Sequence, residues 1–157
     1  MNSYIITKGS GNSKYDLNAF DIALLDSGIA DYNLVRLSSI LPANCHRMES
    51  VNLPKGSFLH TAFSKYIDNR IGITISAAVA IAIPKDKTIS GVIMEVAGDY
   101  DIETADERVC TMAKIAMEAR GITEYNIEKE SISMKTKDGF NCVVAAVSIW
   151  FEGGYSE

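Results

Sequence analysis

The order of hydrophobic and polar residues along the chain predicts two helices. In residues 18–27 apolar positions repeat at helical spacing, with Asn18 as the expected N-cap and Gly28 as the expected stop. The apolar side of this first helix consists of Phe20, Ala23 and Leu24. A second helix is predicted over about residues 104–120, directly before Gly121. Its apolar stripe consists of Ala105, Val109, Met112 and Ala116.

Runs rich in β-branched and small apolar residues predict strands at residues 33–40, 56–67, 71–83, 88–97, 126–135 and 140–151. Turn chemistry at Pro84–Lys87 predicts a buried hairpin between the third and fourth runs, and an Asp138–Gly139 turn connects the last two. The segment Gly9–Ser10–Gly11 lacks the full spacing of a phosphate-binding motif and is interpreted as a loop. The pattern therefore predicts an α+β fold, with mainly antiparallel strands covered by two helices.

Composition narrows the class of protein. The 157 residues, 47% of them hydrophobic, are expected to form a single domain over residues 1–157. No run of about 18 apolar residues occurs, so we expect no membrane span. The first residues lack the basic-then-apolar layout of a signal peptide, so we expect a cytoplasmic protein.

The charged, cysteine and histidine residues exclude several kinds of site. A formal net charge of −5 leaves no basic surface to bind nucleic acid. The acidic charge is compatible with a cationic substrate, and solubility alone explains it at least as well. The three cysteines are widely spaced and predict neither a disulfide framework nor a zinc site. The two histidines, His46 and His60, stand alone, so we expect no metal site.

The adjacent serines Ser38 and Ser39 carry the most specific chemistry. If the backbone is tightly held, the Ser39 hydroxyl can attack the Ser38 carbonyl and convert the peptide bond into an ester. β-Elimination then releases a chain that ends at Ser38, and residue 39 hydrolyses to a pyruvoyl group. A pyruvoyl carbonyl forms a Schiff base with an amine and serves as an electron sink. A serine pair alone is a common dipeptide that usually ends a strand or starts a turn.

The surroundings of the pair make the case more specific. In order, the chain contains Leu17–Asp21, Asn33–Pro42, Ile75–Ala78, Ala82–Lys87 and Gly91–Glu95. Together these segments resemble the pyruvoyl-dependent arginine decarboxylase family, over about residues 17–150. The resemblance implies an αββα sandwich that assembles into a trimer with active sites at subunit interfaces. It also implies self-cleavage into residues 1–38, the β chain, and residues 39–157, the α chain.

The same resemblance implies roles for individual residues. Ser39 is the pyruvoyl precursor, Ser38 is the cleavage site, and Asn33 supports processing. Asp21 accepts the substrate guanidinium. On residue type alone, Asp21 is a solvated carboxylate near a helix start. Apart from the resemblance, the Ser38 hydroxyl would stay at the new C-terminus, which makes it a candidate contact for the substrate carboxylate. Glu95 stands in an apolar strand, either facing outward or serving as an acid, and the resemblance makes it the proton donor. Arg36 is expected to be a structural ion-pair partner.

Strand alternation places Arg36 and Ser38 on one face and Ser39 on the other. The expected function is decarboxylation of L-arginine to agmatine and CO₂ with a covalent pyruvoyl cofactor derived from Ser39. Two alternatives stay open at this point. One is pyruvoyl chemistry on another amino acid, and the other is an uncleaved, non-catalytic binding homologue.

Overall fold

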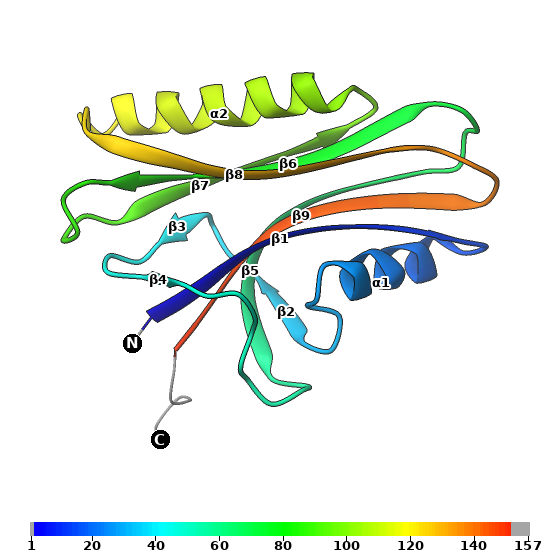
Figure 1. Cartoon of the computed structure of the whole chain (residues 1–157), viewed down its shortest axis with the longest axis horizontal. Helices are drawn as coiled ribbons and strands as arrows, with labels where there is room; N and C mark the ends of the chain where they lie inside the picture. The colour runs from blue at the N-terminus through cyan, green and yellow to red at the C-terminus, as the bar shows by residue number, and fades with distance from the viewer. Residues whose placement is uncertain (1, 152–157) are drawn as a thin grey trace.

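The computed structural model describes residues 2–151, which form four layers (Figure 1). Helix α2 (Ile102–Glu118) covers a four-stranded sheet, and helix α1 (Asp16–Asp26) covers a five-stranded sheet. The two sheets pack face to face between the helices. The expected αββα sandwich is therefore confirmed. No helix in this part of the chain is long and apolar enough to cross a membrane.

The five-stranded sheet has the order β2-β5-β9-β1-β4, and the four-stranded sheet has the order β3-β7-β6-β8. Neighbouring strands are antiparallel, except that β1 runs parallel to β4 and β2 parallel to β5. The bounds are β1 (Asn2–Ser13), β2 (Asn33–Arg36), β3 (Ile40–Leu41), β4 (His46–Arg47), β5 (Phe58–Asp68), β6 (Thr74–Pro84), β7 (Gly91–Gly98), β8 (Tyr125–Lys135) and β9 (Phe140–Phe151). The mainly antiparallel α+β prediction is correct.

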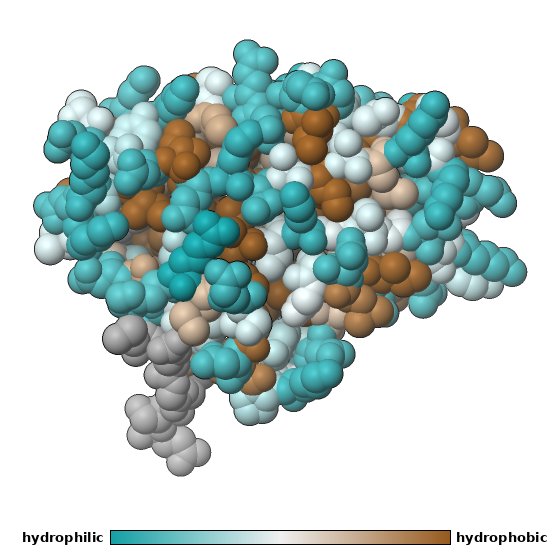
Figure 2. Space-filling view, viewed as in Figure 1, coloured by the Kyte–Doolittle hydropathy of each residue, from teal (hydrophilic) through white to brown (hydrophobic). Residues whose placement is uncertain are grey.

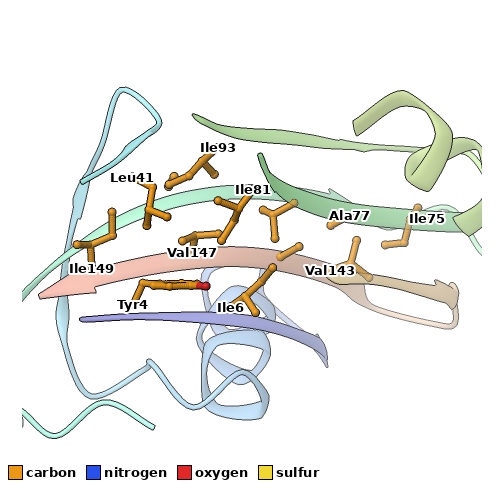
Figure 3. Close-up of a cluster of buried hydrophobic side chains, with 13 residues drawn as sticks. Tyr4, Ile6, Leu41, Ile75, Ala77, Ile81, Ile93, Val143, Val147 and Ile149 are labelled. Atoms are coloured by element: carbon orange, nitrogen blue, oxygen red, sulfur yellow. The ribbon is translucent and has the colours of Figure 1, made fainter. Parts of the chain in front are cut away.

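The main hydrophobic core lies between the two sheets. Figure 3 shows its side chains meeting between the ribbons, with Ile81 and Ile93 from one sheet and Ile6 and Val147 from the other. Both faces of the central strand β6 are buried, because the second face contacts α2. That face carries alanines, whose small side chains allow the helix to lie close to the sheet.

Strand β1 contradicts the interpretation of Gly9–Ser10–Gly11 as a loop, because these residues lie within the strand and pair with β9. The glycines are needed for close approach to α1. A Cβ atom at Gly9 would lie 2.1 Å from the carbonyl oxygen of Ala23, and one at Gly11 would lie 2.3 Å from that of Ala19. Helix α1 therefore rests directly on the backbone of β1, where only glycine fits.

The predicted strand over residues 33–40 is wrong as a single element. Residues 33–36 form β2 in the five-stranded sheet, whereas Ile40 and Leu41 form β3 in the four-stranded sheet. The backbone breaks at Ser39, whose φ of 76° lies in the left-handed region that a strand cannot contain. The chain therefore crosses from one sheet to the other at the serine pair.

The helices differ from their predictions in detail. Helix α1 begins at Asp16, with Tyr15 rather than Asn18 at the N-cap, because the carbonyl of Tyr15 already accepts a hydrogen bond from the Ala19 amide. Both predicted stops are correct, since Gly28 and Gly121 adopt positive φ values directly after the helices. Met112 is exposed, and Ala113 takes its place in the buried stripe of Ala105, Val109, Ala113, Ala116 and Met117.

The hairpin of β6 and β7 across residues 84–87 is confirmed by their antiparallel pairing. Strands β8 and β9 are also present, and Gly139 between them has a φ of 90°. They do not pair with each other. Strand β8 pairs with β6, and β9 pairs with β1 and β5, so this connection also passes between the sheets.

Candidate active site

The serine pair lies in a crossover segment whose backbone is held at both ends. The amide of Leu37 donates a hydrogen bond to the Thr61 carbonyl on β5, at 3.2 Å. Two residues later, the carbonyl of Ser39 accepts a hydrogen bond from the amide of Ile93 on β7, at 2.9 Å. The Ser38–Ser39 peptide bond therefore lies between one attachment to each sheet. This is the tightly held backbone that a serine attack on its own chain requires.

Ser39 is strained and its side chain is directed by a carboxylate. A φ of 76° is uncommon for a residue other than glycine, and strain of this kind typically costs about 1–3 kcal/mol. The Ser39 hydroxyl donates a hydrogen bond of 3.1 Å to Glu95 Oε2. Ser39 is half-buried, whereas Ser38 is exposed. A serine hydroxyl and a potential proton acceptor are thus in direct contact.

Glu95 is supplied by β7, and its side chain is only 19% exposed. Burial raises the pKa of Glu95 above its usual range, and the Ser39 hydrogen bond and the Arg36 guanidinium partly oppose this rise. A carboxyl group with a raised pKa holds and releases a proton closer to neutral pH than an exposed glutamate does.

Arg36 lies on the same side as Ser39, contrary to the expectation from strand alternation. Its Nη2 is 3.7 Å from Glu95 Oε1, while Ser39 contacts the other oxygen of the same carboxylate. The alternation fails because β2 ends at Arg36 and the backbone turns through the crossover before reaching Ser39. Arg36, Ser39 and Glu95 therefore form one cluster, which we call the serine cluster.

A hollow of about 330 Å³ lies beside the crossover. Leu37 and Ile40, the residues on either side of the serine pair, line it together with Pro42, His60, Ile149 and Phe151. Its lining is mostly apolar, which is typical of sites that bind small molecules. His60 is one of the two histidines to which the sequence assigned no role.

Asp21 and Asn33 lie apart from the serine cluster within one chain. Asp21 is exposed on α1 and makes no hydrogen bond or ion pair among the described residues. The side chain of Asn33 donates a 2.7 Å hydrogen bond to the Gly56 carbonyl, at the opposite end of β2 from the serines. Only residues 33–36 form the strand, and the chain passes through the crossover before it reaches Ser38. The structure thus unites Ser39 and Glu95, but not Asp21 or Asn33, in a single chain.

Comparison with known sequences decides the family. The sequence profile of the pyruvoyl-dependent arginine decarboxylase (PvlArgDC) family matches residues 3–152. The chain belongs to this family. Members of the pyruvoyl-dependent arginine decarboxylase family carry a covalent pyruvoyl group, and the residues present here fit it. Ser39 is strained, its hydroxyl is held by Glu95, and an apolar hollow adjoins its backbone.

Individual members of the family are similar along nearly the whole chain. The pyruvoyl-dependent arginine decarboxylase of Methanocaldococcus jannaschii is 39% identical over 151 residues, which cover 96% of this chain and 91% of that protein. That of Methanococcus aeolicus is 37% identical, with 96% and 91% covered. Among solved structures, a pyruvoyl-dependent histidine decarboxylase at pH 8 aligns with 64% of this chain and 52% of its own, at 18% identity and a TM-score of 0.48. That likeness is too distant to add to the family assignment.

Proposed function

We propose that this chain cleaves itself between Ser38 and Ser39 and then decarboxylates L-arginine to agmatine and CO₂. The observation that carries the proposal is the hydrogen bond from the Ser39 hydroxyl to Glu95, made at a strained backbone position. Membership of the pyruvoyl-dependent arginine decarboxylase family supports it independently. The products of cleavage are residues 1–38 and residues 39–157.

Self-cleavage follows from the contacts of the serine cluster. Glu95 accepts the hydroxyl proton as Ser39 Oγ attacks the Ser38 carbonyl carbon, and the C–N bond is replaced by an ester. Loss of the α-proton of residue 39 then expels the Ser38 carboxylate. Hydrolysis of the remaining dehydroalanine releases ammonia and leaves the pyruvoyl group. Relief of the strain at Ser39 favours the first step.

Glu95 then serves the decarboxylation. The pyruvoyl group supplies a carbonyl that binds the substrate amine and accepts its electrons. Glu95 delivers a proton to the carbon from which CO₂ has departed, and its burial suits it to hold that proton near neutral pH.

Asp21 is the proposed partner of the substrate guanidinium. A carboxylate receives a guanidinium through two parallel hydrogen bonds, and Asp21 is exposed and without a partner among the described residues. Ser38, exposed at the new C-terminus, is the proposed contact of the substrate carboxylate. Asn33 is proposed to support processing. We propose that Asp21 and Asn33 act on the serine cluster of a neighbouring subunit.

A trimer of cleaved subunits is the proposed assembly. Large apolar side chains are exposed around β2 and the hollow, at Val35, Ile40, Phe58 and Phe151, and their burial by another copy would be favourable. Figure 2 shows that the apolar side chains on one face of the molecule form separate patches between polar residues. We also propose a cytoplasmic location, which the three unpaired cysteines support.

The direct test is product formation by the purified chain. Incubation with L-arginine should release CO₂ and agmatine in equal amounts, and a Ser39→Ala variant should release neither. L-Lysine and L-ornithine serve as competing substrates. Turnover of lysine or ornithine in preference to arginine would contradict the proposed substrate, and the absence of any turnover by cleaved protein would contradict the enzymatic function.

A further inference from the structure

Arg36 is fixed by a stack of side chains that extends from β2 to helix α1. Its guanidinium carbon lies 4.6 Å from the centre of the Phe63 ring, and its Nη2 donates a 3.0 Å hydrogen bond to the Phe63 carbonyl. Phe63 also stacks against Phe20 with ring centres 6.1 Å apart, and Lys65 Nζ lies 4.2 Å from the Phe20 ring centre. Two cations therefore contact this aromatic pair, Arg36 at Phe63 and Lys65 at Phe20, and of the two Arg36 belongs to the serine cluster.

Arg36 is held in position by more contacts than an ordinary surface ion pair has. Its side chain is 60% exposed, and a freely moving arginine at such a site would contribute almost nothing. Here the aromatic face and the backbone carbonyl hold the guanidinium, which lowers the entropy cost of keeping it beside Glu95. The same contacts leave Glu95 Oε2 free to accept the Ser39 hydroxyl, since Arg36 lies nearer to Oε1.

We propose that Arg36, anchored on Phe63, is a positioning residue that keeps Glu95 ionised and oriented as the acceptor of the Ser39 proton during self-cleavage. This inference rests on the proposed function. It assigns to Arg36 a part in forming the active enzyme that the sequence pattern alone did not indicate.

The surroundings of Glu95 supply few other charges. Its partner on β6 is the buried Val79, and β3 and β9 present apolar residues toward the space between the sheets. Helix α2 packs against the opposite face of this sheet. From β5, the titratable residues on the inward face are His60 and Tyr66, whereas Lys65 points to α1. Arg36 is the charged group that opposes the effect of burial on the pKa of Glu95.

The test is the pH dependence of the cleavage rate, measured by separating the full-length chain from its two products after denaturation. The rate should rise with pH as Glu95 ionises. In Arg36→Met the midpoint of this rise should move upward by about half a pH unit or more, because a favourable charge beside the carboxylate is lost. Arg36→Lys keeps the charge and should restore a midpoint close to that of the wild type.

Lys65→Met is the matched control, because it removes the other cation that contacts the same aromatic pair without removing a contact to Glu95. Its cleavage profile should equal that of the wild type. If Arg36→Met folds less well, Phe63→Leu provides a second measurement, since it keeps the charge but removes its anchor and should slow cleavage. An unshifted midpoint in Arg36→Met, or an equal shift in Lys65→Met, would overturn the role of Arg36. A wild-type chain that never cleaves would instead overturn the proposed function itself, and this inference with it.

Discussion

The sandwich has two long sides, where strands at or next to the edges of its two sheets face each other. On one side, β1 and β4 face β8, and Glu128 accepts hydrogen bonds from Tyr4 at 3.1–3.2 Å and from Arg47 at 3.1 Å. Lys8 and Glu130 add an ion pair at 3.0 Å. We call this the paired side. On the other side, β2 and β5 face β7, and the serine cluster lies beside an open hollow.

The difference lies in what each carboxylate does. Glu128 on the paired side holds the two sheets together, and the pKa of Tyr4 is raised by burial and by that carboxylate. Glu95 on the other side is kept in a buried position that disfavours its charge, next to a serine with strained backbone. Strain and desolvation that lower stability are typical of sites that perform chemistry. The same fold thus has a stabilising carboxylate along one side and the proposed reactive carboxylate along the other.

The largest effect is expected from Glu95→Gln, which removes the proton carrier but keeps the shape of the side chain. In any cleaved fraction, kcat for arginine should be about 10²–10⁴-fold lower, because general acid catalysis typically contributes that much. The measurement is kcat of the cleaved protein at saturating arginine. Glu128→Gln on the paired side is the control and should keep kcat. Near-normal turnover in cleaved Glu95→Gln would remove Glu95 from the chemistry.

Asp21→Asn is expected to have the next largest effect. Loss of a charge-assisted hydrogen-bond pair to the guanidinium should lower kcat/KM for arginine by about one to two orders of magnitude. Cleavage should proceed normally, because Asp21 is proposed to bind the substrate guanidinium and takes no part in the reaction of Ser38 with Ser39. Assays with arginine, lysine and ornithine report the selectivity. If selectivity is unchanged, the guanidinium site is elsewhere and another amino acid becomes the better candidate substrate.

Exchange of glutamate for glutamine on the two sides should change stability in opposite directions. Glu128→Gln should lower the free energy of unfolding by about 1–2 kcal/mol, a decrease in Tm of roughly 2–8 °C. Because the pKa of Glu95 is raised in the folded chain, the protonated form of Glu95 favours folding. This contribution to stability is lost as pH rises through the folded-state pKa, so the charged form of Glu95 is unfavourable at pH 7. Glu95→Gln should therefore raise Tm.

Both exchanges are made in a Ser39→Ala background, so that every chain stays intact during the thermal scan. A decrease in Tm for Glu95→Gln would mean that the charged form of Glu95 stabilises the fold. The two sides would then not differ in the way described above.

The smallest effect concerns alkaline unfolding on the paired side. The pKa of Tyr4 is raised in the folded chain, so at pH above ~10 the unfolded chain loses this proton first. Stability should therefore fall as pH rises above that value. Tyr4→Phe should be less stable than the wild type at pH 8 by about 1 kcal/mol, and this difference should shrink by pH 11. Urea unfolding at both pH values measures it, and a constant difference would contradict the assigned shift.

Much of the fold could be predicted from the sequence because its elements have local causes. Glycines end both helices, and runs of β-branched residues mark the long strands. The split at Ser39 could not be predicted, because it is imposed by hydrogen bonds to Thr61 and Ile93, residues distant in sequence. The loop predicted at Gly9 and Gly11 was wrong for a similar reason. These glycines allow close contact with helix α1 and do not form a turn.

In the candidate site, too, some residues could be predicted from the sequence and others could not. Ser39 and Glu95 were predicted from a motif, and the structure brings them within hydrogen-bonding distance. The contact of Arg36 with Glu95 was missed, because strand alternation placed Arg36 on the opposite face from Ser39. An arginine two residues before the serine pair, in an otherwise apolar segment, was the available signal. The roles of Asp21 and Asn33 stay predictions, since contacts between subunits are not encoded in any local pattern.

The central claim is that the serine cluster cleaves its own chain, and the intact mass of the denatured protein tests it most directly. The wild type should give two chains, residues 1–38 and residues 39–157, and the larger should be lighter by one ammonia than a chain that begins with serine. Its N-terminus should also be blocked to sequencing. Ser39→Ala, which lacks the attacking hydroxyl, should give a single full-length mass. A wild-type chain that keeps its full-length mass after prolonged incubation would contradict the account.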